Sequence, residues 1–324
     1  MAFVVGCGSD IQNIVFVSEV DGDAEIYVVD PESGVAESIT DNRSQDTDPV
    51  WSPNGEQILY VSDSSGDLEI SLFDRKSEHG SRLTNIPGDD HSPRWSPDGE
   101  DLAFISNQDG NAEVYLLSAE GGLPIRITDK TPDDSVGDWS PDGEWLTFSR
   151  VGEVDEKGLW LRNPDGVNLV HLTEGDDYNP NWSPDGKHIV FVRQTGPTDG
   201  GLDIFLASRL KDGTWQDNAE LTRLTKHEAN NDSPVWSPDG NTIAFVSYRD
   251  GNAEIYTMEE DGSNPLRLTT NEADDLEPVW SPGGDHLAFV SHLYGPGEIF
   301  MMDNEGGNQR RLTTNDAEDY SPDW

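Results

Sequence analysis

Seven tryptophans recur along this chain at a nearly constant spacing, and this repeat limits the fold more than any other feature. They are separated by 44, 44, 43, 54, 44 and 44 residues, at Trp51, Trp95, Trp139, Trp182, Trp236, Trp280 and Trp324. Each of the first six is followed by a Ser-Pro-x-Gly turn, in which Pro presets φ and Gly accepts a positive φ. Each unit continues with a short run of β-branched and aromatic residues, such as 58–61. A segment similar to Glu-Ile-Tyr follows that run, and the example in another unit is 25–27. Each unit therefore predicts four short strands.

A period in the low forties with four strands per unit is typical of a β-propeller, in which each unit forms one blade. The chain enters at a second strand near Ile14 and stops at a first strand, 321–324, so the last blade is completed by joining the two ends. The sequence predicts an all-β, seven-bladed β-propeller of four-stranded antiparallel blades, closed by the N- and C-terminal strands. We expect one domain over 11–324, preceded by a separate N-terminal segment, 1–10.

The repeats resemble those of the TolB-like propeller family, a WD-like repeat. Residues 242–269 contain the family's motifs in the same order and nearly unchanged: Ile-Ala-Phe-Val-Ser, Asp-Gly-Asn, Glu-Ile-Tyr and Leu-Arg-Leu-Thr. The resemblance implies a non-enzymatic interaction platform, often outside the cytoplasm. TolB itself is described with six blades and an extra α/β domain, whereas this chain has seven units and no such domain, so TolB's particular partners are not carried over.

The charge balance favours some classes of partner over others. The chain has 64 Asp and Glu against 20 Lys and Arg, a formal net charge of −44. Such a field repels nucleic acid and anionic membrane surfaces and attracts cations or basic proteins. We therefore expect a protein partner of unknown identity and no nucleic acid, with self-assembly as a further alternative. The same acidity suits a marine or halophilic organism.

Two columns of acidic residues stand in register before the tryptophans. Five residues before each Trp are Asp46, Asp90, Asp134, Asp177, Asn231, Asp275 and Asp319. One position earlier are Gln45, Asp89, Asp133, Asp176, Asn230, Asp274 and Glu318. If the Trp strand is innermost, the first column forms an acidic binding ring at the mouth of the central channel.

Converging carboxylates suit hard cations, so Ca²⁺ is a candidate cofactor, with Asp90, Asp134, Asp177, Asp275 and Asp319 as its ligands. The alternative is structural, because Asp and Asn before a strand commonly accept backbone hydrogen bonds and fix the turn.

No catalytic residues are predicted, and we expect the protein not to be an enzyme. The chain has no Gly-x-Ser-x-Gly elbow of a hydrolase. Of seven histidines, only His91 adjoins the acidic column. The alternative is a glycan-binding or polysaccharide lyase-like propeller, since oligogalacturonate lyases use a His-rich metal site. The tryptophans could stack on a ligand, but one per blade favours core packing. Trp215, in the longest unit, either is exposed or folds back on its blade.

The single cysteine lies in Val4-Val5-Gly6-Cys7-Gly8-Ser9, which resembles a bacterial lipobox. This resemblance implies lipidation of Cys7 and an extracytoplasmic protein, periplasmic or at the cell surface, that meets the membrane only through the lipid anchor. Only six residues precede Cys7, fewer than a signal region needs, so either a longer leader exists upstream or the match is accidental.

Overall fold

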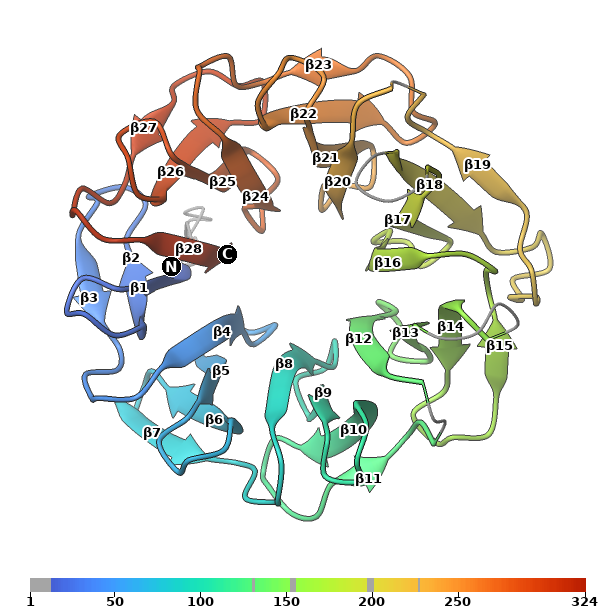
Figure 1. Ribbon diagram of the computed structural model, residues 1–324, viewed down its shortest axis with the longest axis horizontal. Coiled ribbons are helices and arrows are strands. Elements are labelled where there is room, and N and C mark those ends of the chain that lie inside the picture. Colours follow the sequence, from blue (N-terminus) through green and yellow to red (C-terminus); the bar gives the residue numbers. More distant parts are fainter. Residues whose placement is uncertain (1–12, 130–131, 152–155, 197–200, 227) are drawn as a thin grey trace, which may run out of the picture.

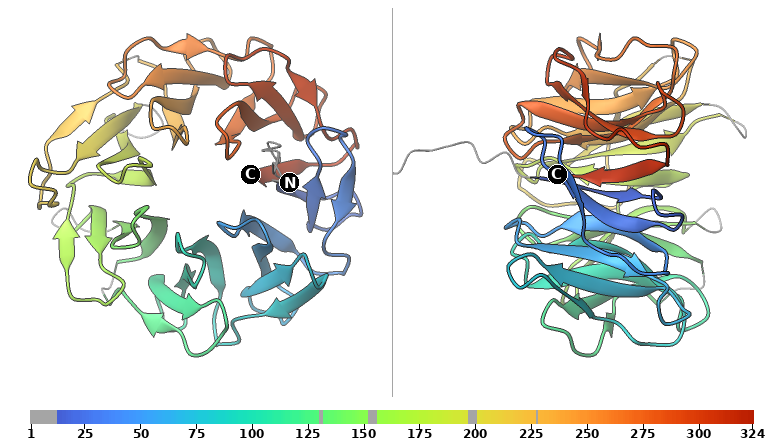
Figure 2. Two further views of the ribbon diagram at one scale, coloured as in Figure 1. Left: turned by 180° about the vertical axis from the view of Figure 1, so that it is seen from behind. Right: turned by 90° about the vertical axis from the view of Figure 1, so that its left-hand side faces the viewer.

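The described residues form a closed ring of seven β-sheets in a computed structural model (Figure 1). Positions are described for residues 13–129, 132–151, 156–196, 201–226 and 228–324. Each sheet has four antiparallel strands in sequence order from the centre to the rim. The edge view in Figure 2 shows a flattened disc with the strands of each blade crossing its thickness. The predicted all-β, seven-bladed propeller is confirmed.

Blade 1 joins the two ends of the chain. It contains β28 (Asp319–Asp323), β1 (Ile14–Ser18), β2 (Glu25–Val29) and β3 (Ala36–Ser38). The innermost strand β28 pairs with β1 at Val17↔Tyr320 and Ser18↔Asp319. The C-terminal strand is the innermost strand of this blade. Strand β1, at the N-terminal end, therefore has a hydrogen-bonded neighbour on both sides and leaves no open edge where the two ends of the chain meet.

The other six blades repeat this plan in chain order, each beginning with its innermost strand. Blade 2 has β4 (Asp46–Trp51), β5 (Gln57–Ser62), β6 (Glu69–Asp74) and β7 (His79–Arg82); blade 3 has β8 (Asp90–Trp95), β9 (Asp101–Ser106), β10 (Glu113–Ser118) and β11 (Ile125–Arg126); blade 4 has β12 (Asp134–Trp139), β13 (Leu146–Arg150), β14 (Gly158–Arg162) and β15 (Leu169–His171). Blade 5 has β16 (Asp177–Trp182), β17 (His188–Gln194), β18 (Leu202–Ser208) and β19 (Leu221–Arg223); blade 6 has β20 (Asn231–Trp236), β21 (Thr242–Ser247), β22 (Glu254–Glu259) and β23 (Leu266–Arg267); blade 7 has β24 (Asp275–Trp280), β25 (His286–Ser291), β26 (Glu298–Asp303) and β27 (Arg310–Arg311).

The tryptophans pack between blades, as predicted for a core role. All seven are 5–8% exposed. Trp280 lies in one cluster with Ala244 of blade 6 and Phe289 of its own blade. The indole Nε1 of Trp280 donates to the Val235 carbonyl of the preceding blade over 3.2 Å. The Trp side chain therefore buries apolar area and satisfies a carbonyl across the seam at the same time.

Trp215 belongs to this core rather than to the surface. It is 8% exposed and contacts Trp182 edge to face, with ring centroids 5.4 Å apart. The reading in which Trp215 folds back on its own blade is confirmed. The polar residues beside Trp215 in the sequence belong to its loop. They do not indicate that its indole side chain is exposed.

Each innermost strand contains a β-bulge before its Trp. In blades other than blade 4, the residue three before Trp has φ of 50–55°, in the left-handed region, and Pro follows it. Blade 4 has Val136-Gly137 at these two positions, and Val136 is not among the residues with positive φ. A β-branched side chain disfavours that region, so the register shift moves to lie between Val136 and Trp139.

Candidate functional site

The predicted acidic ring is buried. Its seven members, Asp46, Asp90, Asp134, Asp177, Asn231, Asp275 and Asp319, are the first residues of the innermost strands and are 0–5% exposed. Their backbone amides tie each blade to the one before it, as when Asp90 N donates to Leu68 O over 2.8 Å. The ring therefore lies in the seams between blades and does not form an open, cation-attracting entrance.

The side chains of this buried ring find partners by three different routes. In blades 1, 2 and 7 an Asn four residues earlier donates to the carboxylate, as when Asn42 Nδ2 donates to Asp46 Oδ2 over 2.7 Å. In blades 4 and 5 an arginine donates twice, as Arg193 does to Asp177 over 2.6 Å from both Nε and Nη2. In blade 6 the ring residue is Asn231, which accepts from Ser247 and Arg249.

Asp90, in blade 3, has none of these partners. The position four residues earlier is Ile86 and the position of the arginine is Ser106. Neither carboxylate oxygen of Asp90 accepts a hydrogen bond of ordinary geometry from a described residue. Burial raises the pKa of Asp90 to about 7, and the nearby Glu69 carboxylate adds to the rise, while the hydroxyls of Ser106 and Thr84 oppose it. Burial therefore favours the protonated form of Asp90 far more than water favours that of an ordinary carboxyl.

The second acidic column is the one that reaches solvent. Asp133, Asp176 and Asp274 are exposed, and Asp89 and Glu318 are partly exposed. We call the seven residues of this column the exposed ring: Gln45, Asp89, Asp133, Asp176, Asn230, Asp274 and Glu318. Neighbouring residues of an extended chain point to opposite sides, so burying one column places the other outside. The sequence showed both columns, and the structure adds that the column predicted to bind is the buried one, while its neighbour reaches solvent.

The exposed ring also fixes loops. One oxygen of Asp133 accepts from Ala112 N over 3.0 Å, and Asp274 does the same for Ala253 N over 2.8 Å. A carboxylate has further acceptor sites beyond the one used by the loop. These residues can therefore hold their loops and still offer negative charge to a partner.

The channel wall carries a mixture of charges. A cavity of about 360 Å³ opens among the innermost strands of blades 3 to 6 and is lined by Arg94, Asp138, Tyr178, Asn181 and residues beside them. Arg94 is the one Lys or Arg in the seven innermost strands, all of which are described. Asp138 accepts from Trp139 N over 2.8 Å, and Asn181 accepts from Trp236 N over 2.9 Å. The channel mouth is thus polar and accessible, although the buried ring does not line it.

The predicted metal site has no shared coordination sphere in the part of the chain that the structure describes. No group of three or more His, Cys, Asp and Glu there is arranged to hold an ion. Asp90, Asp134, Asp177, Asp275 and Asp319 begin five different innermost strands and so do not converge. Calcium binding stays a prediction.

The remaining candidates are isolated residues. His91 is partly buried, contacts Ser92 Oγ at 3.0 Å through Nδ1, and has its pKa lowered by burial. His91 follows Asp90 of the buried ring in the sequence, but it is not part of a His cluster among the described residues. Cys7 lies outside the described residues, so its lipidation stays a prediction. None of the described residues lies in a helix long and apolar enough to span a membrane.

The fold and these sites define a closed seven-bladed propeller whose polar face surrounds an accessible channel. The family model of the TolB beta propeller domain matches residues 67–209, 165–273 and 216–324, which together cover most of the chain. The chain therefore belongs to the TolB beta propeller family.

Known proteins are similar to this chain in short sequence segments and in overall fold. The Tol-Pal system protein TolB of Thioalkalivibrio sulfidiphilus is 55% identical over 31 residues, 10% of this chain and 7% of that protein. The crystal structure of TolB from Acinetobacter baumannii is 20% identical, with a TM-score of 0.63 over 98% of this chain and 67% of that one. An oligogalacturonate lyase in complex with manganese is 17% identical, with a TM-score of 0.73 over 91% of this chain and 86% of that one. The aligned segment thus spans a small part of the curated TolB, and the two structures show a shared fold.

Proposed function

We propose that this protein is a non-catalytic binding scaffold that works outside the cytoplasm and contacts a protein partner through the exposed ring and the channel mouth. The observation that carries the proposal is the exposure of Asp133, Asp176 and Asp274 around one face of a TolB-family propeller. Similarity to a Tol-Pal system protein supports a protein partner and an extracytoplasmic location. The negative face would select a partner with a basic surface and speed its encounter at low salt.

Affinity capture from cell-envelope extracts tests this proposal. The bait is the wild type or the triple variant D133N/D176N/D274N, in which the Asn side-chain oxygen can still fix each loop. A matched control, D98N/D142N/D239N, removes the same charge from the Ser-Pro-Asp-Gly turns, which the antiparallel strand order places on the opposite face. We expect a partner retained by the wild type and the control and lost by the ring variant. Equal recovery by all three proteins would contradict the role of the exposed ring.

Cation assistance is a separate part of the proposal. The exposed carboxylates could share Ca²⁺ with acidic groups of a partner, because hard cations prefer oxygen ligands. Capture is repeated with calcium and with a chelator at constant ionic strength, so that screening does not change. Partner loss with the chelator would support cation assistance, and unchanged recovery would remove it while leaving the scaffold intact.

The second candidate is a glycan-binding or lyase-like propeller, which the fold similarity to oligogalacturonate lyase favours. Incubation with oligogalacturonate and Mn²⁺ tests it, because β-elimination creates a carbon–carbon double bond conjugated with the carboxylate that absorbs in the ultraviolet. Growth of this absorbance with protein concentration would support a lyase. Saturable oligogalacturonate binding without it would support a lectin-like role.

A further inference from the structure

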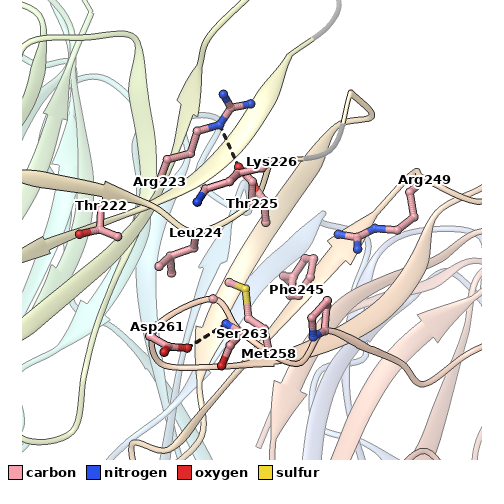
Figure 3. Close-up of a pocket in the computed structure, with 12 residues that line it drawn as sticks. Thr222, Arg223, Leu224, Thr225, Lys226, Phe245, Arg249, Met258, Asp261 and Ser263 are labelled. Carbon is pink, nitrogen blue, oxygen red and sulfur yellow. Dashed lines mark hydrogen bonds between the residues drawn. The ribbon is translucent and has the colours of Figure 1, made fainter.

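A second cavity lies away from the channel, in the seam between blades 5 and 6 (Figure 3). Its volume is about 420 Å³. One wall comes from β19 and the residues that follow it, including Arg223, Leu224 and Lys226. The other wall comes from Phe245 of β21, Arg249 and Met258 of β22. The turn after β22, with Asp261 and Ser263, closes one end.

This cavity has a cationic lining in a very acidic protein. Three of its residues are cationic, Arg223, Lys226 and Arg249, and one is acidic, Asp261. Asp261 Oδ1 accepts from Ser263 N over 2.8 Å and so serves the turn. The whole chain has a formal net charge of −44, so a cavity with more positive than negative side chains differs strongly from the rest of the protein.

Arg249 contacts the buried ring as Arg150 and Arg193 do, from a position two residues further along the chain, but it has no carboxylate partner there. Arg150 and Arg193 each donate two hydrogen bonds to the Asp of the buried ring, Asp134 and Asp177. Arg249 donates from Nη2 to Asn231 Oδ1 over 3.1 Å instead, and from Nε to Ser247 Oγ over 2.8 Å. No ion pair joins Arg249 to a described carboxylate. The replacement of Asp by Asn leaves its positive charge without a counter-ion.

The other two cations differ in how far they are neutralised. Arg223 Nη2 pairs with Asp203 at 2.6 Å and its Nε donates to Thr225 O over 2.8 Å. Lys226 is exposed and forms no ion pair with a described residue. After the Arg223–Asp203 pair is counted, the lining still holds two cations, Arg249 and Lys226, and one carboxylate, Asp261.

Beneath the cations the cavity is apolar. Phe245 is 0% exposed, Met258 2% and Leu224 6%. The Arg249 guanidinium carbon lies 4.4 Å from the Tyr256 ring centroid and 5.7 Å from that of Phe245. These aromatic contacts hold the guanidinium in place, so an arriving anion meets a pre-organised donor.

We infer that this cavity binds a small organic anion, whose carboxylate pairs with Arg249 and Lys226 while its apolar part lies against Phe245, Met258 and Leu224. A guanidinium suits a carboxylate because its N–H donors form a fork that matches the two oxygens. The site is separate from the exposed ring and goes beyond the scaffold function, so either proposal can fail without the other.

Calorimetric titration of the full chain with benzoate at constant ionic strength tests the inference. The variant N231D places a carboxylate where Asn231 now contacts Arg249, and R249M removes the cation but keeps an apolar chain. We expect saturable benzoate binding by the wild type and a loss of at least about tenfold in affinity with either variant. K187M, which removes an exposed cation paired with Asp185 in another blade turn, is the control and should bind as the wild type does.

Three results would overturn the inference. The first is no saturable benzoate binding by the wild type. The second is unchanged binding by N231D, which is expected to fold because the other six blades have Asp at this position. The third is inorganic phosphate binding as tightly as benzoate, which would show that the apolar part of the cavity contributes nothing.

Discussion

Arg150 donates two hydrogen bonds to Asp134, from Nε at 2.7 Å and from Nη2 at 2.8 Å, with side-chain exposures of 3% and 0%. The pair joins the end of β13 to the start of β12. Arg150 also lies over the rings of Phe148 and Trp160, 5.4 and 5.1 Å from their centroids. The guanidinium is therefore fixed by charge and by packing together.

Removing Arg150 should destabilise the fold strongly. R150A leaves the Asp134 carboxylate buried without its partner, and breaking a buried pair in this way costs about 3–5 kcal/mol. Urea denaturation measures the change in the free energy of unfolding. The exposed pair Lys187–Asp185 supplies the control, since K187A should change stability by less than about 0.5 kcal/mol. An R150A protein as stable as K187A would show that the buried pair contributes nothing.

Asp90 should make the protein less stable as the pH rises. Its pKa is raised to about 7 in the folded state from an ordinary value of 3.8, so between about pH 4 and 7 the folded state holds a proton that the unfolded state has released. Stability therefore falls with rising pH across this window and changes no further on this account above it. D90N, which copies Asn231 of blade 6, should remove this contribution.

Urea denaturation of the wild type and D90N at pH 5 and pH 8 separates Asp90 from the other acids. The variant should gain stability relative to the wild type at pH 8, with a smaller difference at pH 5. Equal differences at the two pH values would mean that Asp90 does not titrate in this window.

Gly158 should tolerate no side chain, although five other blades have Glu at this position and blade 5 has Asp203. Its φ is +127°, and an added Cβ would lie 2.0 Å from the Thr173 carbonyl oxygen. G158A should lower the free energy of unfolding by about 2 kcal/mol or more, through backbone strain and overpacking. G283A is the control, because the nearest atom to its added Cβ would be an Asp285 carboxylate oxygen at 3.7 Å. Similar melting temperatures for G158A and G283A would contradict the steric argument.

The melting temperature should rise with NaCl. With a net charge of −44, the acidic side chains of the folded propeller repel one another, and salt screens that repulsion. Differential scanning calorimetry from low to molar NaCl measures the effect, with sucrose as a control for preferential exclusion without screening. A melting temperature that gains nothing from salt would count against adaptation to a salty environment.

The repeat in the sequence was sufficient for the architecture. The spacing of Trp51 to Trp324, the turn after each Trp and the β-rich runs predict the number of blades, the order of strands and closure through β28 and β1. These features are local or periodic, and each blade packs mainly on its neighbours. The core role of the tryptophans followed from the same regularity.

Tertiary structure alone decided which acidic column is buried and where an unpaired cation lies. Asp89 and Asp90 are alike in sequence, but the hydrogen bond from Asp90 N to Leu68 O docks one side of the strand against the preceding blade, so Asp90 is buried and Asp89 is not. Arg249 reaches Asn231 eighteen residues away and shares a cavity with Lys226 of another blade. Such contacts depend on how adjacent sheets pack and on which way each side chain turns, and a strand pattern contains neither.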